Sequence, residues 1–153
     1  MTTIATPMGI RNNNPGNLRR AYGMLYPTVI NNGYAQYRTM TDGVQSLAML
    51  VSDYYVQHGL KTLPDFVSRY APASENDVAQ YVRNMTLILK ANPLTVRERD
   101  LRLDISWNAL EFIRAVIRCE NSLPALSLYP SGEWVTVDEV YTGMQRAAKW
   151  KVL

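Results

Sequence analysis

Apolar residues over most of the chain recur at spacings of three and four, the period of an amphipathic helix. The first such run follows Thr41, a residue type that caps helix N-termini, and Gly59 is expected to end it. Its apolar positions are Val44, Leu47, Leu50, Val51, Tyr54 and Tyr55. This pattern predicts a helix with one face in a core and the other in solvent.

Further helices are predicted by the same period. They cover residues 62 to 71, where Ala71-Pro72 stops the helix, 74 to the residues before Pro93, 107 to about 118 after Ser106, and 136 to about 150. Ser74 with Asp77 resembles a capping box, and Thr136 with Glu139 is a clearer one. The charged segment 96–104 favours one or two additional turns.

The first part of the chain shows no helical period. Asparagine, glycine and proline are frequent in residues 1–34 and favour an ordered loop region with one short strand. Residues 34–40 alternate between apolar and polar and suit a strand ending at Thr39. We therefore expect a mainly α protein with at most a short β element. It is a single domain over residues 1–153, with a loop-rich basic segment (1–40) and a helical body (41–153).

Composition fits one globular domain. The chain has 153 residues, of which 47% are hydrophobic and 19% charged. It lacks the roughly 20 uninterrupted apolar residues of a membrane span. Its first ten residues lack the basic and apolar regions of a secretory signal. A protein acting outside the cytoplasm would then need another carrier, such as a phage particle or a lysis pore.

The chain has one cysteine and one histidine, which argues against disulfides, zinc sites and most cysteine or histidine catalysis. Cys119 has no cysteine to pair with, and His58 precedes the helix-ending Gly59, where it suits a surface or capping role. Zinc sites need several such ligands, and a Ser-His-Asp triad would lack the usual nucleophile-elbow pattern. We expect neither a metal nor a cofactor.

Positive charge gathers at the start of the chain. The net charge is +3, and four arginines precede Asp42, the first acidic residue. A basic lead segment suits an anionic partner such as murein or a phosphate backbone, or an arm on a neighbouring subunit. Lysine and arginine elsewhere are scattered and form no known binding motif, which argues against a nucleic-acid partner.

Glu120 is the most informative acidic residue. It continues the apolar face formed by Ile113, Val116 and Ile117 at a helix end. Partial burial and the helix dipole would both raise its pKa. A protonated carboxyl group suits glycosidic cleavage, because the leaving oxygen must receive a proton. Alternatively, Glu120 lies in water or caps a backbone amide.

Two other polar clusters have a structural and a functional interpretation each. Glu75 and Asn76 lie near a helix N-terminus, where acidic residues complement the dipole, but Glu75 is also a candidate partner carboxylate for Glu120. The loop from Gly9 to Arg20 carries amides and guanidinium groups that suit sugar hydroxyl, acetamido and carboxylate groups. The same side chains could instead hold the loop's own backbone.

Four motifs, over Gly9–Arg19, Tyr54–Thr62, Arg69–Tyr81 and Ala115–Asn121, occur in the order found in a family of phage and prophage proteins. The chain resembles this family over residues 9 to about 145. Its members are labelled phage structural or virion proteins, and some are regarded as lysozyme-like or transglycosylase-like. In this chain Tyr70 replaces a tryptophan, Ser122 replaces a glycine, and the segment 123–134 is longer.

The resemblance implies a lysozyme-like helical domain and a phage particle or lysis context, with peptidoglycan and other virion proteins as partners. Its motif positions imply Glu120 and Glu75 as catalytic residues. The implied substrate-binding residues are Arg11, Asn12, Asn13, Asn14, Asn17, Tyr70, Asn76, Tyr81 and Asn121.

Two hypotheses follow. In the first, the domain cleaves murein between N-acetylmuramic acid and N-acetylglucosamine with Glu120 as general acid, either as a lytic transglycosylase or as a muramidase. In the second, it is a non-enzymatic virion component, such as a tail or baseplate plug, that keeps a lysozyme-like fold. Both place the protein in a phage particle, or in the host cytoplasm before lysis.

Overall fold

A computed structural model describes residues 6–20, 29–89, 107–121 and 135–152. Helices dominate these residues, which confirms the mainly α prediction. The elements are α1 (Met8–Arg11), β1 (Val29–Asn31), β2 (Tyr34–Gln36), α2 (Met40–Val56), α3 (Leu63–Tyr70), α4 (Val78–Leu89), α6 (Trp107–Asn121) and α7 (Val137–Val152). Ser106 and the expected turns at 96–104 lie outside the described residues.

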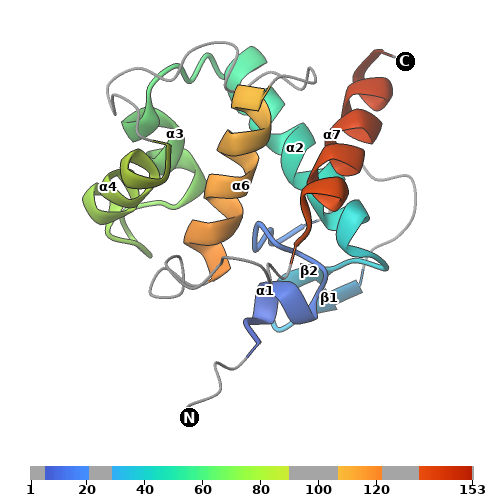
Figure 1. Cartoon of the computed structure of the whole chain (residues 1–153). Helices are drawn as coiled ribbons and strands as arrows, with labels where there is room; N and C mark the ends of the chain where they lie inside the picture. Colours follow the sequence, from blue (N-terminus) through green and yellow to red (C-terminus); the bar gives the residue numbers. More distant parts are fainter. Residues whose placement is uncertain (1–5, 21–28, 90–106, 122–134, 153) are drawn as a thin grey trace.

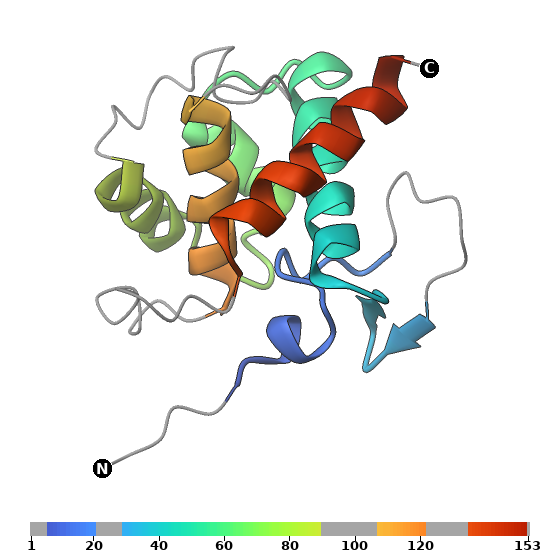
Figure 2. The same cartoon turned by 45° about the vertical axis from the view of Figure 1, so that its right-hand side comes forward.

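Helix α6 runs between two pairs of helices, with α3 and α4 on one side and α2 and α7 on the other (Figure 1). Phe112 of α6 is fully buried and meets the Phe66 ring edge-on, with 5.1 Å between ring centroids. Helix α7 crosses α2 (Figure 2), and a Cβ on Gly143 would lie 2.6 Å from Val44. A glycine therefore allows this close crossing.

Capping side chains determine where the helices begin. Thr39, not Thr41, caps α2, because its extended backbone lets its hydroxyl oxygen accept a hydrogen bond from the Asp42 amide at 3.1 Å. Thr62 caps α3 as expected, through the Asp65 amide at 3.2 Å. The Thr136–Glu139 capping box of α7 is also confirmed.

Two further boundaries differ from the sequence expectation. Helix α4 begins at Val78, because Asp77 is the residue whose carboxylate accepts from the Gln80 amide, while Ser74 lies in the preceding turn. Helix α6 continues three residues beyond Arg118, to Asn121. Glu120 is therefore part of the last helical turn.

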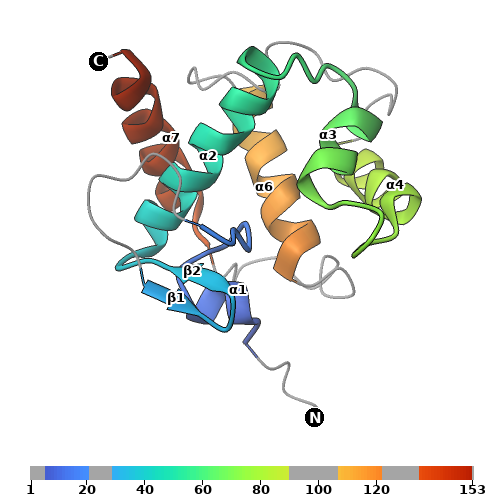
Figure 3. The same ribbon diagram turned by 180° about the vertical axis from the view of Figure 1, so that it is seen from behind.

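A small antiparallel hairpin and a helical turn lie below the helices (Figure 3). In the hairpin, Ile30 pairs with Ala35, and the Asn32-Gly33 turn has positive φ at both positions. Such a turn matches the twist of a two-residue hairpin, and the Asn-Gly pair was its signal in the sequence. The strand expected to reach Thr39 stops at Gln36, and the helical turn α1 was not predicted.

The chain after α1 turns back through a Schellman motif. The Asn13 amide donates to the Ile10 carbonyl at 3.1 Å and the Asn14 amide to the Gly9 carbonyl at 2.7 Å. This motif needs a left-handed residue, and Asn13 supplies it with φ of 51°. The returning loop lies directly on Gly43 of α2, where a Cβ would be 1.9 Å from the Asn13 carbonyl oxygen.

We expect Gly43→Ala to lower the free energy of unfolding by about 1–3 kcal/mol, because the methyl group would displace the loop backbone. Helix propensity alone predicts the opposite, a gain of about 1 kcal/mol. Urea denaturation measures the sign. Ala79→Gly, on the exposed face of α4, is a control for the propensity effect. A stabilised Gly43→Ala protein would contradict the tight contact.

Candidate active site

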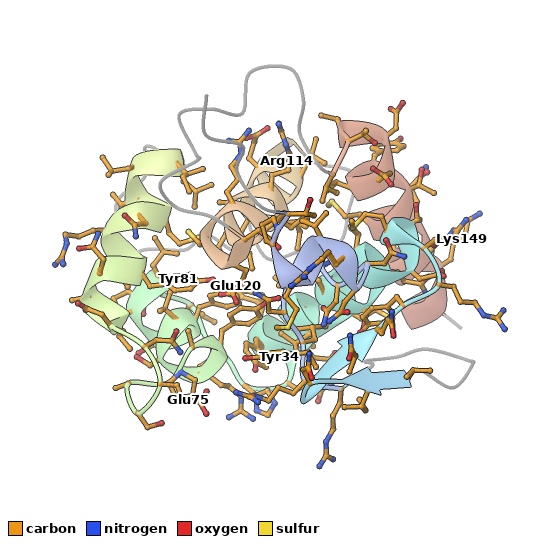
Figure 4. The ribbon with its side chains drawn as sticks, turned by 90° about the horizontal axis from the view of Figure 1, so that it is seen from below. Tyr34, Glu75, Tyr81, Arg114, Glu120 and Lys149 are labelled. Atoms are coloured by element: carbon orange, nitrogen blue, oxygen red, sulfur yellow. The ribbon has the colours of Figure 1, made fainter. Side chains whose placement is uncertain are left out.

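Glu120 is held by side chains from two other segments (Figure 4). The Tyr81 hydroxyl of α4 donates to Oε2 at 2.6 Å. The Asn17 amide, from the loop after α1, donates to Oε1 at 3.4 Å and to the Glu120 backbone carbonyl at 2.8 Å. The carboxyl group thus joins α6, α4 and the N-terminal loop. The apolar face that the sequence predicts for α6 is present, with Ile113, Val116 and Ile117 buried.

Burial raises the pKa of Glu120 above its ordinary value, while the hydrogen bonds from Tyr81 and Asn17 oppose that rise by favouring the charged form. The same surroundings, with burial as the main cause, raise the pKa of Tyr81 well above its usual range and that of the Cys119 thiol to about 12. Tyr81 therefore stays protonated and remains a hydrogen-bond donor. The tendency of the Glu120 carboxyl group is toward the neutral acid.

Glu120 lies in the wall of a cleft of about 660 Å³. The cleft runs between the N-terminal loop, α2, and the segment joining α3 to α4. Its lining residues are Gly16, Asn17, Leu18, Arg19, Arg20, Tyr34, Leu50, Tyr54, Arg69, Tyr70, Ala71, Pro72, Glu75, Asn76 and Glu120. Of the expected site residues, the cleft brings together Asn17, Tyr70, Glu75, Asn76 and Glu120.

Three expected sugar contacts instead hold the loop together. The Asn14 side chain is fully buried and bonds the Leu18 amide and carbonyl and the Ala35 carbonyl. The Asn13 amide donates to the Tyr37 and Arg38 carbonyls, and the buried Asn12 side chain accepts from Asn31. These three do not line the cleft, because their side chains satisfy neighbouring polar groups.

Asn121 does not line the cleft either. It is buried, and its amide donates to the Pro15 carbonyl at 2.6 Å and to the Ile117 carbonyl at 2.7 Å. It therefore fastens the N-terminal loop to the end of α6. Arg11 is exposed at the end of α1 and is likewise not part of the lining. Neither residue belongs to the cleft lining.

Tyr70 and Glu75 occupy different parts of the cleft. The Tyr70 ring stacks on Phe66, with 5.4 Å between centroids, and its hydroxyl donates to the Gly16 carbonyl. Glu75 lies apart from the Tyr81–Glu120 pair (Figure 4) and 3.5 Å from the Arg19 guanidinium. Both side chains of this ion pair are 57% exposed, so it links the two sides of the cleft in a solvated position.

Sequence reasoning did not single out several residues of the lining. Arg69 is one of them, although it belongs to the Arg69–Tyr81 motif, and its guanidinium lies over the Tyr54 ring at 5.3 Å. Arg19 was expected only as one of the guanidinium groups of the Gly9–Arg20 loop, and it lies over the Tyr34 ring at 4.7 Å. The partners of each arginine–tyrosine pair lie about fifteen residues apart in the sequence, so no local pattern pointed to these contacts.

The described residues contain no group of three or more histidine, cysteine, aspartate or glutamate side chains placed to hold a metal ion. Within the same residues, no helix is both long and apolar enough to cross a membrane.

Comparison with known proteins links the chain to a phage protein. No family model matches the sequence. The chain is similar to Protein P5 of Pseudoalteromonas phage PM2, with 26% identity over 80 residues. The aligned part is 48% of this chain and 50% of the phage protein, so the similarity spans about half the length of this relative. The comparison therefore shows a partial similarity to a phage protein.

Proposed function

We propose that the chain is a murein-cleaving, lytic transglycosylase-like domain of a phage virion, with Glu120 as general acid. The observation that carries the proposal is a largely buried carboxyl group with a raised pKa in the wall of a 660 Å³ cleft. A general acid must hold its proton near the working pH and still reach the substrate. The partial similarity to a phage protein and the motif resemblance support the phage context.

The proposed reaction uses Glu120 twice. Its proton passes to the O4 atom of the departing N-acetylglucosamine as the bond to C1 of N-acetylmuramic acid breaks. The resulting carboxylate then takes the proton of the muramic C6 hydroxyl, whose oxygen bonds to C1. Between the two steps, the hydrogen bonds from Tyr81 and Asn17 stabilise the charged form.

This route needs no second carboxylate. It agrees with the position of Glu75, which lies apart from Glu120 and faces Arg19 (Figure 4). Glu75 is more than half exposed, and its carboxylate faces the Arg19 guanidinium at 3.5 Å. Hydrolysis would instead require Glu75 or another base to activate a water molecule. Anhydro-muramic products indicate the transglycosylase route, and reducing muramic ends indicate hydrolysis.

The sugar-contacting residues in this proposal are Asn17, Tyr70 and Asn76, which line the cleft. We assign Tyr81 the role of positioning residue, because its hydroxyl reaches Glu120 but Tyr81 does not belong to the lining. Asn12, Asn13, Asn14 and Asn121 shape the loop.

A second candidate function is a non-enzymatic virion component. It is favoured by the two hydrogen bonds that the Glu120 carboxyl group accepts, from Asn17 and from Tyr81. A carboxyl group that connects two other segments in this way also suits a purely structural role. This alternative predicts the protein in stoichiometric copies in purified particles and no murein release by the purified chain.

Replacing Glu120 with glutamine tests the proposal. Glu120→Gln keeps the shape of the side chain but cannot give up a proton, so murein turbidity clearing should fall by at least about a hundredfold. Glu111→Gln, on the same helix and outside the cleft, should clear murein as the wild type does. Clearing that survives in Glu120→Gln would remove Glu120 from the mechanism.

The pH profile should respond to Tyr81. Activity requires protonated Glu120 and therefore falls as the pH rises through the raised Glu120 pKa. Tyr81→Phe removes a hydrogen bond that lowers this pKa, so the alkaline limb of the profile should move to higher pH. Tyr141→Phe, exposed on α7, is the matched control. If the alkaline limb of the Tyr81→Phe profile stays in place, Tyr81 does not influence the pKa of the group that controls activity.

Stability should show the same titration independently of activity. The folded state holds the Glu120 proton more tightly than the unfolded state. This contribution is therefore complete below the ordinary pKa of 4.5 and is lost as the pH rises through the raised value. Denaturant midpoints across this range should decline less in Glu120→Gln than in the wild type. Parallel declines would mean that the carboxyl group titrates normally.

A further inference from the structure

The cleft carries more positive than negative charge at its edge. Arg19, Arg20 and Arg69 line it, whereas the lining acids are Glu120, which tends toward the neutral form, and Glu75. Glu75 forms an ion pair with Arg19, with 3.5 Å between the carboxylate oxygen and the guanidinium nitrogen.

Arg69 contacts two ring side chains. Its guanidinium lies 5.3 Å from the centre of the Tyr54 ring, and its Nη2 is 3.3 Å from Nε2 of His58. Within the described ranges, no carboxylate oxygen lies within ion-pair distance of Arg69. Stacking on Tyr54 limits the freedom of the guanidinium without neutralising it, so its remaining donors can bind an anion.

Arg19 is held in a related way on the other side of the cleft. It lies over the Tyr34 ring at 4.7 Å, so it keeps one support when its partner Glu75 is removed. An incoming carboxylate would compete with Glu75 for the Arg19 guanidinium. Because both members of the ion pair are 57% exposed, their mutual attraction is weak and can be exchanged.

We infer that Arg19 and Arg69 form a carboxylate-recognition site at the edge of the cleft, which selects murein with free carboxylates over neutral glycans of the chitin type. The inference rests on the proposed murein function and names the part of the substrate that the cleft distinguishes. Two murein groups have the required chemistry, the carboxylates of the stem peptide and the lactyl carboxyl group of muramic acid from which the peptide has been removed. Guanidinium groups bind both through paired N–H donors.

The test measures binding rather than cleavage. The full chain carrying Glu120→Gln is titrated with a soluble muropeptide, with the same glycan stripped of its peptide by an amidase, and with a chitin oligosaccharide. We expect Arg69→Gln to weaken muropeptide binding about threefold to fivefold and to leave chitin binding unchanged. Glu75→Gln should act in the opposite direction and tighten muropeptide binding, because it frees Arg19.

Matched variants and salt complete the design. Arg83→Gln, on the exposed face of α4 where Arg83 bonds Gln80, removes the same charge away from the cleft and should have no effect. The Arg69-dependent part of binding should weaken with added salt. In the muropeptide the lactyl carboxyl group is held in an amide, so an Arg69 effect there reports the stem-peptide carboxylates. If the stripped glycan shows the Arg69 effect as well, the site also binds the freed lactyl carboxylate; if it does not, the site is specific for the stem peptide.

Equal muropeptide and chitin affinities, or an Arg69→Gln protein that binds muropeptide unchanged, would overturn the inference even if murein is cleaved. Arg69-dependent muropeptide binding by a chain that releases no murein would overturn the proposed reaction and leave the recognition site standing. Absence of all binding would overturn both.

Discussion

The hydrogen bonds between Asn17, Glu120 and Tyr81 are the constraint on which the candidate site depends. A carboxyl group on α6 is taken largely out of water, which costs free energy unless donors replace the lost solvent. The donors come from α4 and from the N-terminal loop, so one side chain connects three parts of the fold. The cleft adjoins this junction. The hydrogen bonds that hold the three segments together thus also influence the pKa of Glu120.

Some asparagine side chains of the N-terminal loop fix the loop's conformation and do not themselves line the cleft. Asn13 takes a left-handed conformation that few other residues adopt at low cost, and Asn14 bonds backbone groups that no regular element satisfies. Gly43 on α2 leaves room for the loop backbone. With the loop fixed in this way, Asn17 can point its amide at Glu120.

The cleft has a buried wall, which contains Glu120, and an exposed edge, which carries the arginines. Burial favours a neutral acid in the wall, where a proton donor is proposed. At the edge, aromatic rings hold two arginine guanidinium groups in place without cancelling their charge. In the proposed function, the edge of the cleft recognises carboxylates of the glycan, and the carboxyl group in the wall, whose pKa burial raises, donates the proton.

The sequence by itself determined the helical class, most helix positions, the capping residues Thr62 and Thr136, and the burial of the α6 face beside Glu120. These features depend on short-range periodicity and on side chains that bond backbone a few residues away. Only the tertiary structure decided the start of α2 at Thr39 and the division of the asparagines between loop support and cleft. It also joined Glu120 to Asn17, more than a hundred residues earlier, and set Glu75 against Arg19. Such pairings arise when distant segments pack together, and no local pattern specifies which amide or guanidinium group will meet a given carboxyl group.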